Sequence, residues 1–392
     1  MVATTTVGII ANPASARDIR RIVAHGGAVT THDKLNRLQR LLVGLSSSGV
    51  ERVITMADGS GITAGLLQLA DRPSACSWPA LKVVDQLITR TDTDSRVATK
   101  AMVDAGVGAI VVLGGDGTNR IVAGESGDVP LVSISTGTNN AFPLPLEPTV
   151  AGLAAGLIAA SDDCRRVGTY RAKKLVVHHR DRTEDALVDV AISDADGVGA
   201  GAVWNAASVL ELFLCFAEPD AIGLSSIGGH LHPVGRREPG GLAIALGEPA
   251  VATVRPPIGP GLVEAVDVRS ISTLVPEVAV EVRSSTGVVA VDGERLFRFG
   301  SDDRPSVTLR ADGPCVVDVS ATLAYAAANG LLAGPDPGST RTPDSDSVPD
   351  GSDPTRPPQK GNAHDVSQPA RPLHRDGSHP AVRVPNLAGV PR

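Results

Sequence analysis

The stretch that most constrains the fold is an apolar run at residues 109–113, followed directly by Gly-Gly-Asp-Gly-Thr at residues 114–118. An unbroken run with β-branched residues is typical of a strand that is buried on both faces. The glycines let the backbone approach a ligand closely and leave amide groups able to point at phosphate oxygens. Thr118 or Asn119 is expected to cap a following helix, whose N-terminus favours an anion. The alternative is an ordinary strand-to-helix turn that is rich in glycine.

Strand-like and helix-like stretches alternate through the first part of the chain. We expect strands at residues 6–11, 52–57, 81–89, 109–113 and 130–134, and helices at 33–45, 61–70 and 93–105. This alternation predicts a parallel α/β sheet with right-handed connections. Polar loops follow three of the strands, at residues 12–17, 114–119 and 136–140. Because the carboxyl ends of parallel strands share one edge of the sheet, these loops are expected to share one ligand.

The composition changes from residue 166 onward, where short apolar runs separated by Gly, Pro and Asp-Gly predict an antiparallel β domain. Strands are expected at residues 174–178, 186–192, 241–245, 250–254, 264–268, 277–283, 288–291, 306–309 and 315–319. Helices are expected at 150–160, at 200–216, and at 322–332, where the last one packs back onto the first domain. We therefore predict an α/β domain at residues 1–147, a β-rich domain at 148–333, and a disordered tail rich in Pro, Ser and Asp at 334–392.

The composition also excludes several classes of function. A net charge of −7 argues against nucleic acid as the partner. The four cysteines show no Cys-x-x-Cys spacing, so we expect neither a zinc site nor a disulfide framework, and a reduced cytoplasmic compartment fits. Neither a signal peptide nor an apolar run of about 18 residues is present, so no membrane is expected as a partner. We further expect a homo-oligomer.

With these residues described, a family resemblance can be stated. Residues 114–118 resemble the hallmark of the superfamily that joins NAD kinases, diacylglycerol-type lipid kinases and sphingosine kinases, which also pair an α/β domain with a β-rich domain. Residues 10–15 (IANPAS), 18–21 (DIRR), 135–143 (STGTNNAFP) and 222–233 (IGLSSIGGHLHP) resemble one subgroup more closely. This subgroup is the ATP-NAD kinase family proteins related to acetoin catabolism protein X, and the similarity covers residues 5–330.

The resemblance implies phosphoryl transfer from ATP, with Mg²⁺ and with Asp116 as the acid that positions the metal or the acceptor hydroxyl. It implies a nucleotide-binding set made of Asn12, Pro13, Ser15, Gly114, Gly115, Gly117, Thr118, Asn119, Thr136, Gly137, Thr138, Asn139 and Asn140. Two positions depart from the family pattern. Asn140 stands where the lipid kinases carry an acid, and Ala16 replaces the glycine that is usual in the Asn-Pro turn. Both departures bear on nucleotide affinity or metal binding.

A second acidic motif, Val-Asp-Gly-Glu-Arg at residues 291–295, resembles the Asp-Gly-Glu motif of the lipid kinases. The acids of that motif lie near the acceptor and serve as general base, which implies catalytic roles for Asp292 and Glu294. The alternative is a simple hairpin turn, for which Asp-Gly is the strongest short signal.

The acceptor is less well defined by the sequence. The Asn-Asn-Glu element and the dinucleotide loop of NAD kinases are not intact, and the closest match, at residues 224–230, suggests Ser226, Gly228, Gly229 and His230 as acceptor contacts. Few aromatic residues and no basic amphipathic helix count against a lipid. The preferred hypothesis is transfer from ATP or polyphosphate to the 2′-hydroxyl of the adenosine ribose of NAD, giving NADP. The alternatives are a non-enzymatic nucleotide-binding regulator of an acetoin-type catabolic pathway, and a lipid kinase of the diacylglycerol kinase type.

Overall fold

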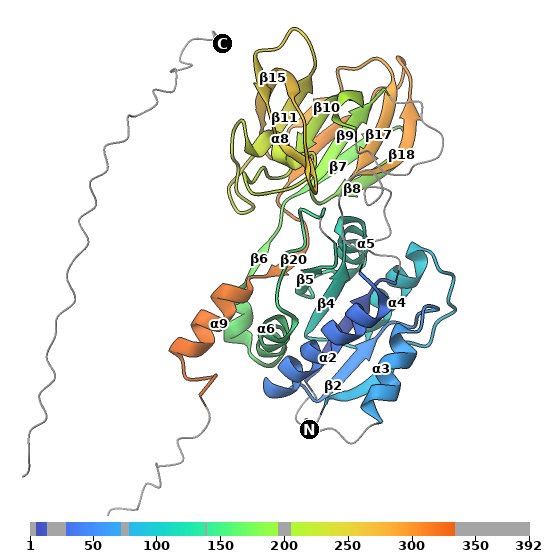
Figure 1. The fold of residues 1–392 in the computed structure, drawn as a ribbon, viewed down its shortest axis with the longest axis vertical. Helices are drawn as coiled ribbons and strands as arrows, with labels where there is room; N and C mark the ends of the chain where they lie inside the picture. Colours follow the sequence, from blue (N-terminus) through green and yellow to red (C-terminus); the bar gives the residue numbers. More distant parts are fainter. Residues whose placement is uncertain (1–4, 14–28, 72–77, 138, 195–204, 334–392) are drawn as a thin grey trace, which may run out of the picture. The chain divides into compact units, whose positions relative to one another are not determined.

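The computed structural model describes residues 5–13, 29–71, 78–137, 139–194 and 205–333, and the predicted disordered tail lies outside these residues. The described chain forms a largely parallel sheet covered by helices and a set of antiparallel sheets (Figure 1). The predicted fold class is therefore confirmed for the described residues.

The first sheet has the strand order β3-β2-β1-β4-β5-β20-β6. Its strands are β3 (Ala80–Val83), β2 (Arg52–Thr55), β1 (Thr6–Ala11), β4 (Ala109–Gly114), β5 (Leu131–Ser135), β20 (Cys315–Val317) and β6 (Thr169–Arg171). All neighbouring pairs are parallel except β20 with β6. β6 directly precedes the antiparallel sheets in the sequence and β20 follows them, so the chain returns to the first sheet after forming those sheets.

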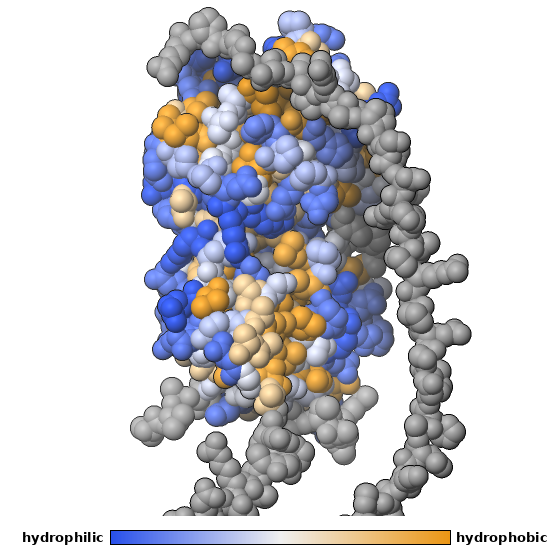
Figure 2. Space-filling view, turned by 90° about the vertical axis from the view of Figure 1, so that its left-hand side faces the viewer, coloured by the Kyte–Doolittle hydropathy of each residue, from blue (hydrophilic) through white to orange (hydrophobic). Residues whose placement is uncertain are grey.

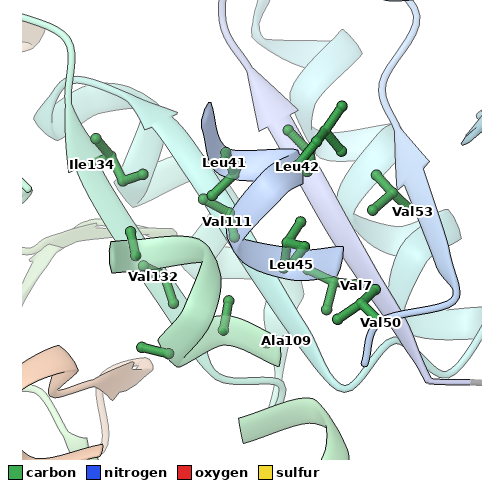
Figure 3. Close-up of a cluster of buried hydrophobic side chains, with 14 of the residues drawn as sticks. Val7, Leu41, Leu42, Leu45, Val50, Val53, Ala109, Val111, Val132 and Ile134 are labelled. Carbon is green, nitrogen blue, oxygen red and sulfur yellow. The ribbon is translucent and has the colours of Figure 1, made fainter. Parts of the chain in front are cut away.

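Helices bury β4 on both faces, as its unbroken apolar sequence predicts. The helices are α2 (Thr31–Ser47), α3 (Ile62–Ala70), α4 (Asp92–Asp104), α5 (Asp116–Ser126), α6 (Pro148–Ala160), α7 (Asp162–Gly168) and α9 (Val319–Ala328). Val111 packs with Leu41 and Leu45 of α2 in one core (Figure 3), whereas Ile110 packs with Met102 of α4 in a second core. Ala326 of α9 belongs to the same core as Val7 of β1 and Val111 of β4, which confirms that the last helix packs against the first domain.

The second half forms antiparallel sheets with the orders β12-β15-β11-β10-β9-β17-β18 and β16-β19-β7-β8, and a small β13-β14 pair. The strands are β7 (Lys174–His179), β8 (Arg182–Ala186), β9 (Asp189–Ser193), β10 (Val209–Leu214), β11 (Gly241–Leu246), β12 (Ala252–Val254), β13 (Pro257–Gly259), β14 (Leu262–Val263), β15 (Val266–Leu274), β16 (Ala279–Glu281), β17 (Gly287–Val291), β18 (Glu294–Phe299) and β19 (Ser306–Arg310). A short helix, α8 (Ser225–Gly229), lies between β10 and β11.

Three sequence predictions of individual elements are corrected. The helix expected at residues 200–216 is wrong, because residues 209–214 form β10, which pairs with both β9 and β11. An apolar run of this length does not distinguish a buried strand from a helix. The strand expected at 81–89 ends at Val83, because its partner β2 ends at Thr55. The strand expected at 186–192 begins only at Asp189, because the amides of Leu187 and Val188 donate to Asp292 instead.

The molecular surface is mixed in polarity. On the face in Figure 2, hydrophobic residues gather in its lower half among hydrophilic ones. Large apolar side chains exposed on α6, on α7 and after α9 are Val150, Val167, Leu331 and Leu332. In the described part of the chain, no helix is both long and apolar enough to cross a membrane. The expected homo-oligomer stays a prediction.

Candidate functional site

Three polar loops meet at the carboxyl ends of β1, β4 and β5, which are neighbours in the first sheet. Asn12, directly after β1, donates from Nδ2 to the Thr118 Oγ1 of α5 at 2.7 Å. Thr136, directly after β5, donates from its amide to the Gly114 carbonyl of β4 at 3.4 Å. The loops therefore converge, as their positions after parallel strands predict. Ser15 and Thr138 lie outside the described residues.

Helix α5 begins at Asp116, with Gly115 as its N-cap and no side-chain cap, so the expected cap at Thr118 or Asn119 is wrong. Both side chains lie inside the first turns, and Asn119 donates from Nδ2 back to the Gly115 carbonyl at 2.9 Å. The Asp116 carboxylate accepts the amides of Ala141 at 3.1 Å and Phe142 at 2.8 Å. The loop after β5 is thus bound directly to the start of α5.

Two of the loop glycines lie close to other residues of the site. A Cβ atom on Gly114 would lie 2.6 Å from the Cβ of Thr118, and one on Gly117 would lie 2.8 Å from the Oε1 of Glu294. Real Cβ atoms do not approach other atoms so closely. At Gly114 a larger residue would push against Thr118, whereas at Gly117 it would meet the far end of the flexible Glu294 side chain, which can move aside.

The loop after β5 and the turn after β1 are also held by neighbouring side chains. The amide Nδ2 of Asn140 donates to the Ser135 hydroxyl at 2.9 Å, and that hydroxyl donates to the Gly137 carbonyl at 2.9 Å. The carbonyls of Asn12 and Pro13 accept the Lys34 ammonium at 2.8 and 3.0 Å. Lys34 is buried on α2 and brings a positive charge to this edge of the sheet.

The Asp-Gly-Glu motif is both a hairpin turn and part of this site. Asp292 and Gly293 join β17 to β18 with positive φ angles of 47° and 78°, as a two-residue type I′ turn requires. The buried Asp292 carboxylate accepts the amides of Leu187 at 3.0 Å and Val188 at 2.8 Å. The turn therefore fixes this acid inside the protein, and the two interpretations of the sequence are compatible.

Arg120 brings the two acidic motifs together, and sequence reasoning missed it. Its Nε lies 3.5 Å from the Oδ2 of Asp292, and its Nη2 lies 2.9 Å from the Oε2 of Glu294. Arg120 follows Asp116 by four residues, and residues at this spacing share one helix face. That spacing was the available signal, because an arginine one turn after a site acid points in the same direction.

The electrostatics of the site change the acidity of Asp292. Burial and the negative charge of Asp116 raise the pKa of Asp292 to about 7, although Arg120 and the amides of Val188 and Leu187 act in the opposite direction. A carboxyl group with a pKa near neutrality can gain and release a proton at physiological pH, which suits a general base.

A small pocket of about 20 Å³ lies beside these acids, with room for one or two water molecules. Asp116, Asp189 and Asp292 line it, together with Asn139 and Ser225. Ser225 is 1% exposed, and within the described chain its hydroxyl has no hydrogen-bond partner. The pocket is therefore acidic, and it holds one polar group that is available to a ligand.

The residues suggested as acceptor contacts lie next to this pocket but do not line it. The Ser226 hydroxyl donates to the Gly223 carbonyl at 2.6 Å. A Cβ atom on Gly228 would lie 2.5 Å from Leu214, and one on Gly229 would lie 2.3 Å from the Glu218 carbonyl. His230 is exposed, with its Nε2 3.2 Å from the Pro219 carbonyl. The lining residues of this segment are its immediate predecessors, residues 222–225.

The oxygen donors at the pocket decide how a metal ion could be held there. Among the residues that the structure describes, no group of three or more His, Cys, Asp or Glu is arranged to hold one. Mg²⁺ is commonly bound through one or two carboxylates, with phosphates and waters completing its shell. The Asp116 carboxylate is a hard oxygen donor at the pocket wall and fits that mode of binding.

Comparison with known proteins covers both halves of the chain. Residues 7–161 match the family model of the ATP-NAD kinase N-terminal domain, and residues 173–312 match that of the acetoin catabolism protein X C-terminal domain. Acetoin catabolism protein X of Cupriavidus necator is 44% identical over 335 residues, which cover 83% of this chain and 93% of that protein.

A search of solved structures also finds similar chains. Yeast NADH kinase complexed with NADH gives a TM-score of 0.44 at 14% identity, over 87% of this chain and 90% of that chain. An NAD kinase from Archaeoglobus fulgidus in complex with ATP gives 0.35 at 13% identity, over 84% and 100%. The resemblance identified from the sequence motifs is confirmed by the family models and the curated relative. The chain belongs to the acetoin catabolism protein X family, and its N-terminal domain is of the ATP-NAD kinase type.

Proposed function

We propose that this protein is a phosphotransferase that passes a phosphoryl group from a nucleoside triphosphate to a hydroxyl group held near Asp292. The first acceptor to test is the 2′-hydroxyl of the adenosine ribose of NAD, and the product would be NADP. One observation carries the proposal: Asp116 of the glycine loop and Asp292 of the β17–β18 turn line the same pocket.

The start of α5 supplies the side of the site that binds phosphate. The helix begins at Asp116 without a side-chain cap, and the N-terminus of a helix favours anions through its amide groups and dipole. The buried Lys34 adds a positive charge beside the turn at Asn12 and Pro13. Phosphoryl transfer depends mainly on positioning and on charge neutralisation, and these groups provide both.

Magnesium would supply further neutralisation of phosphate charge. Asp116 is the residue that would hold it, with phosphate oxygens and waters as the other ligands. The amides of Ala141 and Phe142 fix the direction of the Asp116 carboxylate before any ligand binds.

The acceptor side is organised around Asp292. With a pKa of about 7, its carboxylate can take the proton of the attacking hydroxyl. The bond between the acceptor oxygen and phosphorus forms while the bond from phosphorus to the leaving nucleoside diphosphate breaks. Arg120 keeps Asp292 and Glu294 in place beside the first turn of α5. The acidic pocket disfavours a phosphate group and suits a neutral hydroxyl-bearing part of the acceptor.

The test is to incubate the purified full chain with NAD and Mg²⁺, with ATP or polyphosphate as donor, and to assay NADP enzymatically. NADP formation is expected with at least one donor, and Asp116→Ala should lower the rate on the order of 10² or more. Asp163→Ala, at an exposed acid of α7 that pairs with Arg166, is the control and should leave the rate unchanged.

Each contrary result has a defined meaning. Absence of NADP with both donors would reject NAD as acceptor. Calorimetric nucleotide binding without turnover on NAD or on lipid in mixed micelles would favour the non-enzymatic nucleotide-binding alternative. Near-normal activity of Asp116→Ala would reject the assignment of the catalytic loop.

A further inference from the structure

Arg236 binds the carbonyl groups of the same two residues, Ala141 and Phe142, whose amides Asp116 binds. Its Nη1 donates to the Phe142 carbonyl at 2.7 Å, and its Nη2 donates to the Ala141 carbonyl. The amides of Ala141 and Phe142 donate to the Asp116 carboxylate. The peptide group that joins Ala141 to Phe142 therefore lies between a carboxylate on its N–H side and a guanidinium on its C=O side.

The Arg236 side chain is itself well fixed. Its Nε donates to the two carboxylate oxygens of Glu218 at 3.0 and 2.9 Å. Its guanidinium carbon lies 4.5 Å from the ring centroid of Phe216, at a distance typical of a cation–π contact. The side chain is only 17% exposed. Arg236 is thus a rigid fork that projects from the β-rich half onto the loop after β5.

This arrangement fixes the orientation of the loop. Hydrogen bonds to an ionised group are about twice as strong as bonds between neutral groups, and here they act at both ends of the Ala141–Phe142 peptide dipole. Rotating this peptide plane would break both charge-assisted bonds. The segment that carries Asn139, a pocket-lining residue, is therefore held in one orientation.

We infer that Arg236 is a positioning residue, which orients residues 139–142 and, through their amides, the carboxylate of Asp116. The inference rests on the proposed function for the part that concerns catalysis. Arg236 does not line the pocket, so it acts through Ala141 and Phe142 rather than on a substrate.

The neighbouring Arg237 offers a matched control. It pairs with Asp318, and its guanidinium carbon lies 4.3 Å from the ring centroid of Tyr170. The two arginines are adjacent and each combines an acid with an aromatic ring, but the hydrogen bond described for Arg237 goes to Asp318 and not to the loop. Lysine keeps the charge of arginine but loses its planar fork, so Arg236→Lys and Arg237→Lys test the fork at each position.

The experiment measures amide hydrogen exchange at residues 139–142, together with kcat and KM for the nucleotide and for NAD. Arg236→Lys should accelerate exchange of the Ala141 and Phe142 amides about tenfold and lower kcat about tenfold, with the nucleotide KM changed less than about threefold. Arg237→Lys should change neither quantity. The inference is overturned if Arg236→Lys leaves the exchange unchanged, or if Arg237→Lys accelerates it equally.

A second variant keeps the inference testable if Arg236→Lys does not fold. Glu218→Gln leaves Arg236 in place but weakens its anchor, and it should accelerate exchange of the same two amides to a smaller extent. Unchanged exchange in Glu218→Gln, with Arg236→Lys unfolded, also rejects the inference. Because exchange is measured without turnover, absence of NADP formation would reject the proposed function and leave the role of Arg236 to be decided by the exchange data.

Discussion

Arg120 contacts Asp292 across the two halves of the chain, with 3.5 Å between its Nε and the carboxylate Oδ2. The first residue lies on the helix that begins at the glycine loop, and the second lies in a turn of the β-rich half. Because the positive charge favours the ionised carboxylate, Arg120 lowers the pKa of Asp292 against the effects of burial and of Asp116. This pair therefore influences the proton affinity of the proposed base.

Replacing Arg120 with methionine should raise the pKa of Asp292 above its value of about 7. A smaller fraction of the base is then ionised at neutral pH, so activity should fall on the order of tenfold at pH 7 and recover partly as the pH rises. The pH dependence of kcat/KM measures this shift. Arg120→Lys should restore most of the wild-type profile.

Arg96→Met is the control for loss of a helix-surface arginine, because Arg96 pairs with Glu125 at an exposed position. Its pH profile should match that of the wild type. An identical profile for Arg120→Met would contradict the role given to the Arg120–Asp292 pair.

The acidity of Asp292 also predicts how stability depends on pH. Its pKa is raised from 3.8 to about 7 in the folded protein, so the folded state binds an extra proton between these values. Binding of this extra proton stabilises the folded state. The stabilisation is fully present below about pH 3.8 and is lost as the pH rises through 7. Relative to Asp292→Asn, the wild type should lose on the order of 4 kcal/mol of unfolding free energy across this window. Urea denaturation at several pH values measures the difference.

Several other charged or titratable groups surround Asp292. They are Asp116 and Arg120 of α5, Glu294 of β18, Asp189 of β9 and the buried Cys215 thiol, whose pKa is raised by burial and by Asp292. Asp303 is a control whose pKa shifts in the opposite direction, because a hydrogen bond from the Gly300 amide lowers it. The ionised Asp303 carboxylate therefore stabilises the folded protein above about pH 3.8, and this stabilisation is lost as the pH falls. Equal pH dependence in wild type and Asp292→Asn would refute the raised pKa.

The sequence predicts the fold where one physical signal dominates. The run at residues 109–113 is apolar at every position, and the structure buries it on both faces. By contrast, the run at 209–214 is apolar apart from Glu211 and does not reveal its partners, and its strand was mistaken for a helix. β18 was missed because four of its six residues are polar or exposed, so no apolar run marks it.

The site was predictable only where a motif marked it. The glycine loop and the Asp-Gly-Glu turn each have a local signal, and their approach to one pocket follows from the fold. Arg120 has only its four-residue spacing from Asp116 as a signal, and Arg236 has none. Their partners are 174 residues away at Glu294 and 94 residues away at Phe142, so their roles depend on long-range packing.

The Ser225 hydroxyl should contribute to acceptor binding, because it is buried beside the pocket without a partner in the described chain. Ser225→Ala should lower kcat/KM for the acceptor about 3- to 10-fold, which corresponds to about 0.5–1.5 kcal/mol for one hydrogen bond. Stability should not fall, since the folded protein loses no bond. Steady-state kinetics and thermal unfolding measure the two effects.

Ser133 is the control, because its hydroxyl is also buried without a described partner but lies on β5, away from the pocket lining. Ser133→Ala should leave the kinetics unchanged. If both variants reduce kcat/KM equally, the effect does not arise from the pocket.

The crossing of α2 and α6 gives a prediction for stability that is independent of function. A Cβ atom on Gly152 of α6 would lie 2.4 Å from the Leu41 carbonyl and 3.0 Å from the Leu45 amide of α2. Both atoms belong to the backbone and cannot rotate away, so Gly152→Ala should force the helices apart and cost roughly 1–3 kcal/mol of unfolding free energy.

Gly124 of α5 is the control, because a Cβ atom there would meet nothing within 4 Å. Gly124→Ala should therefore stabilise the protein by about 0.5–1 kcal/mol, through the lower chain entropy of alanine when unfolded. Chemical denaturation measures the unfolding free energy of the two variants. If Gly152→Ala were as stable as Gly124→Ala, this account of the helix crossing would be contradicted.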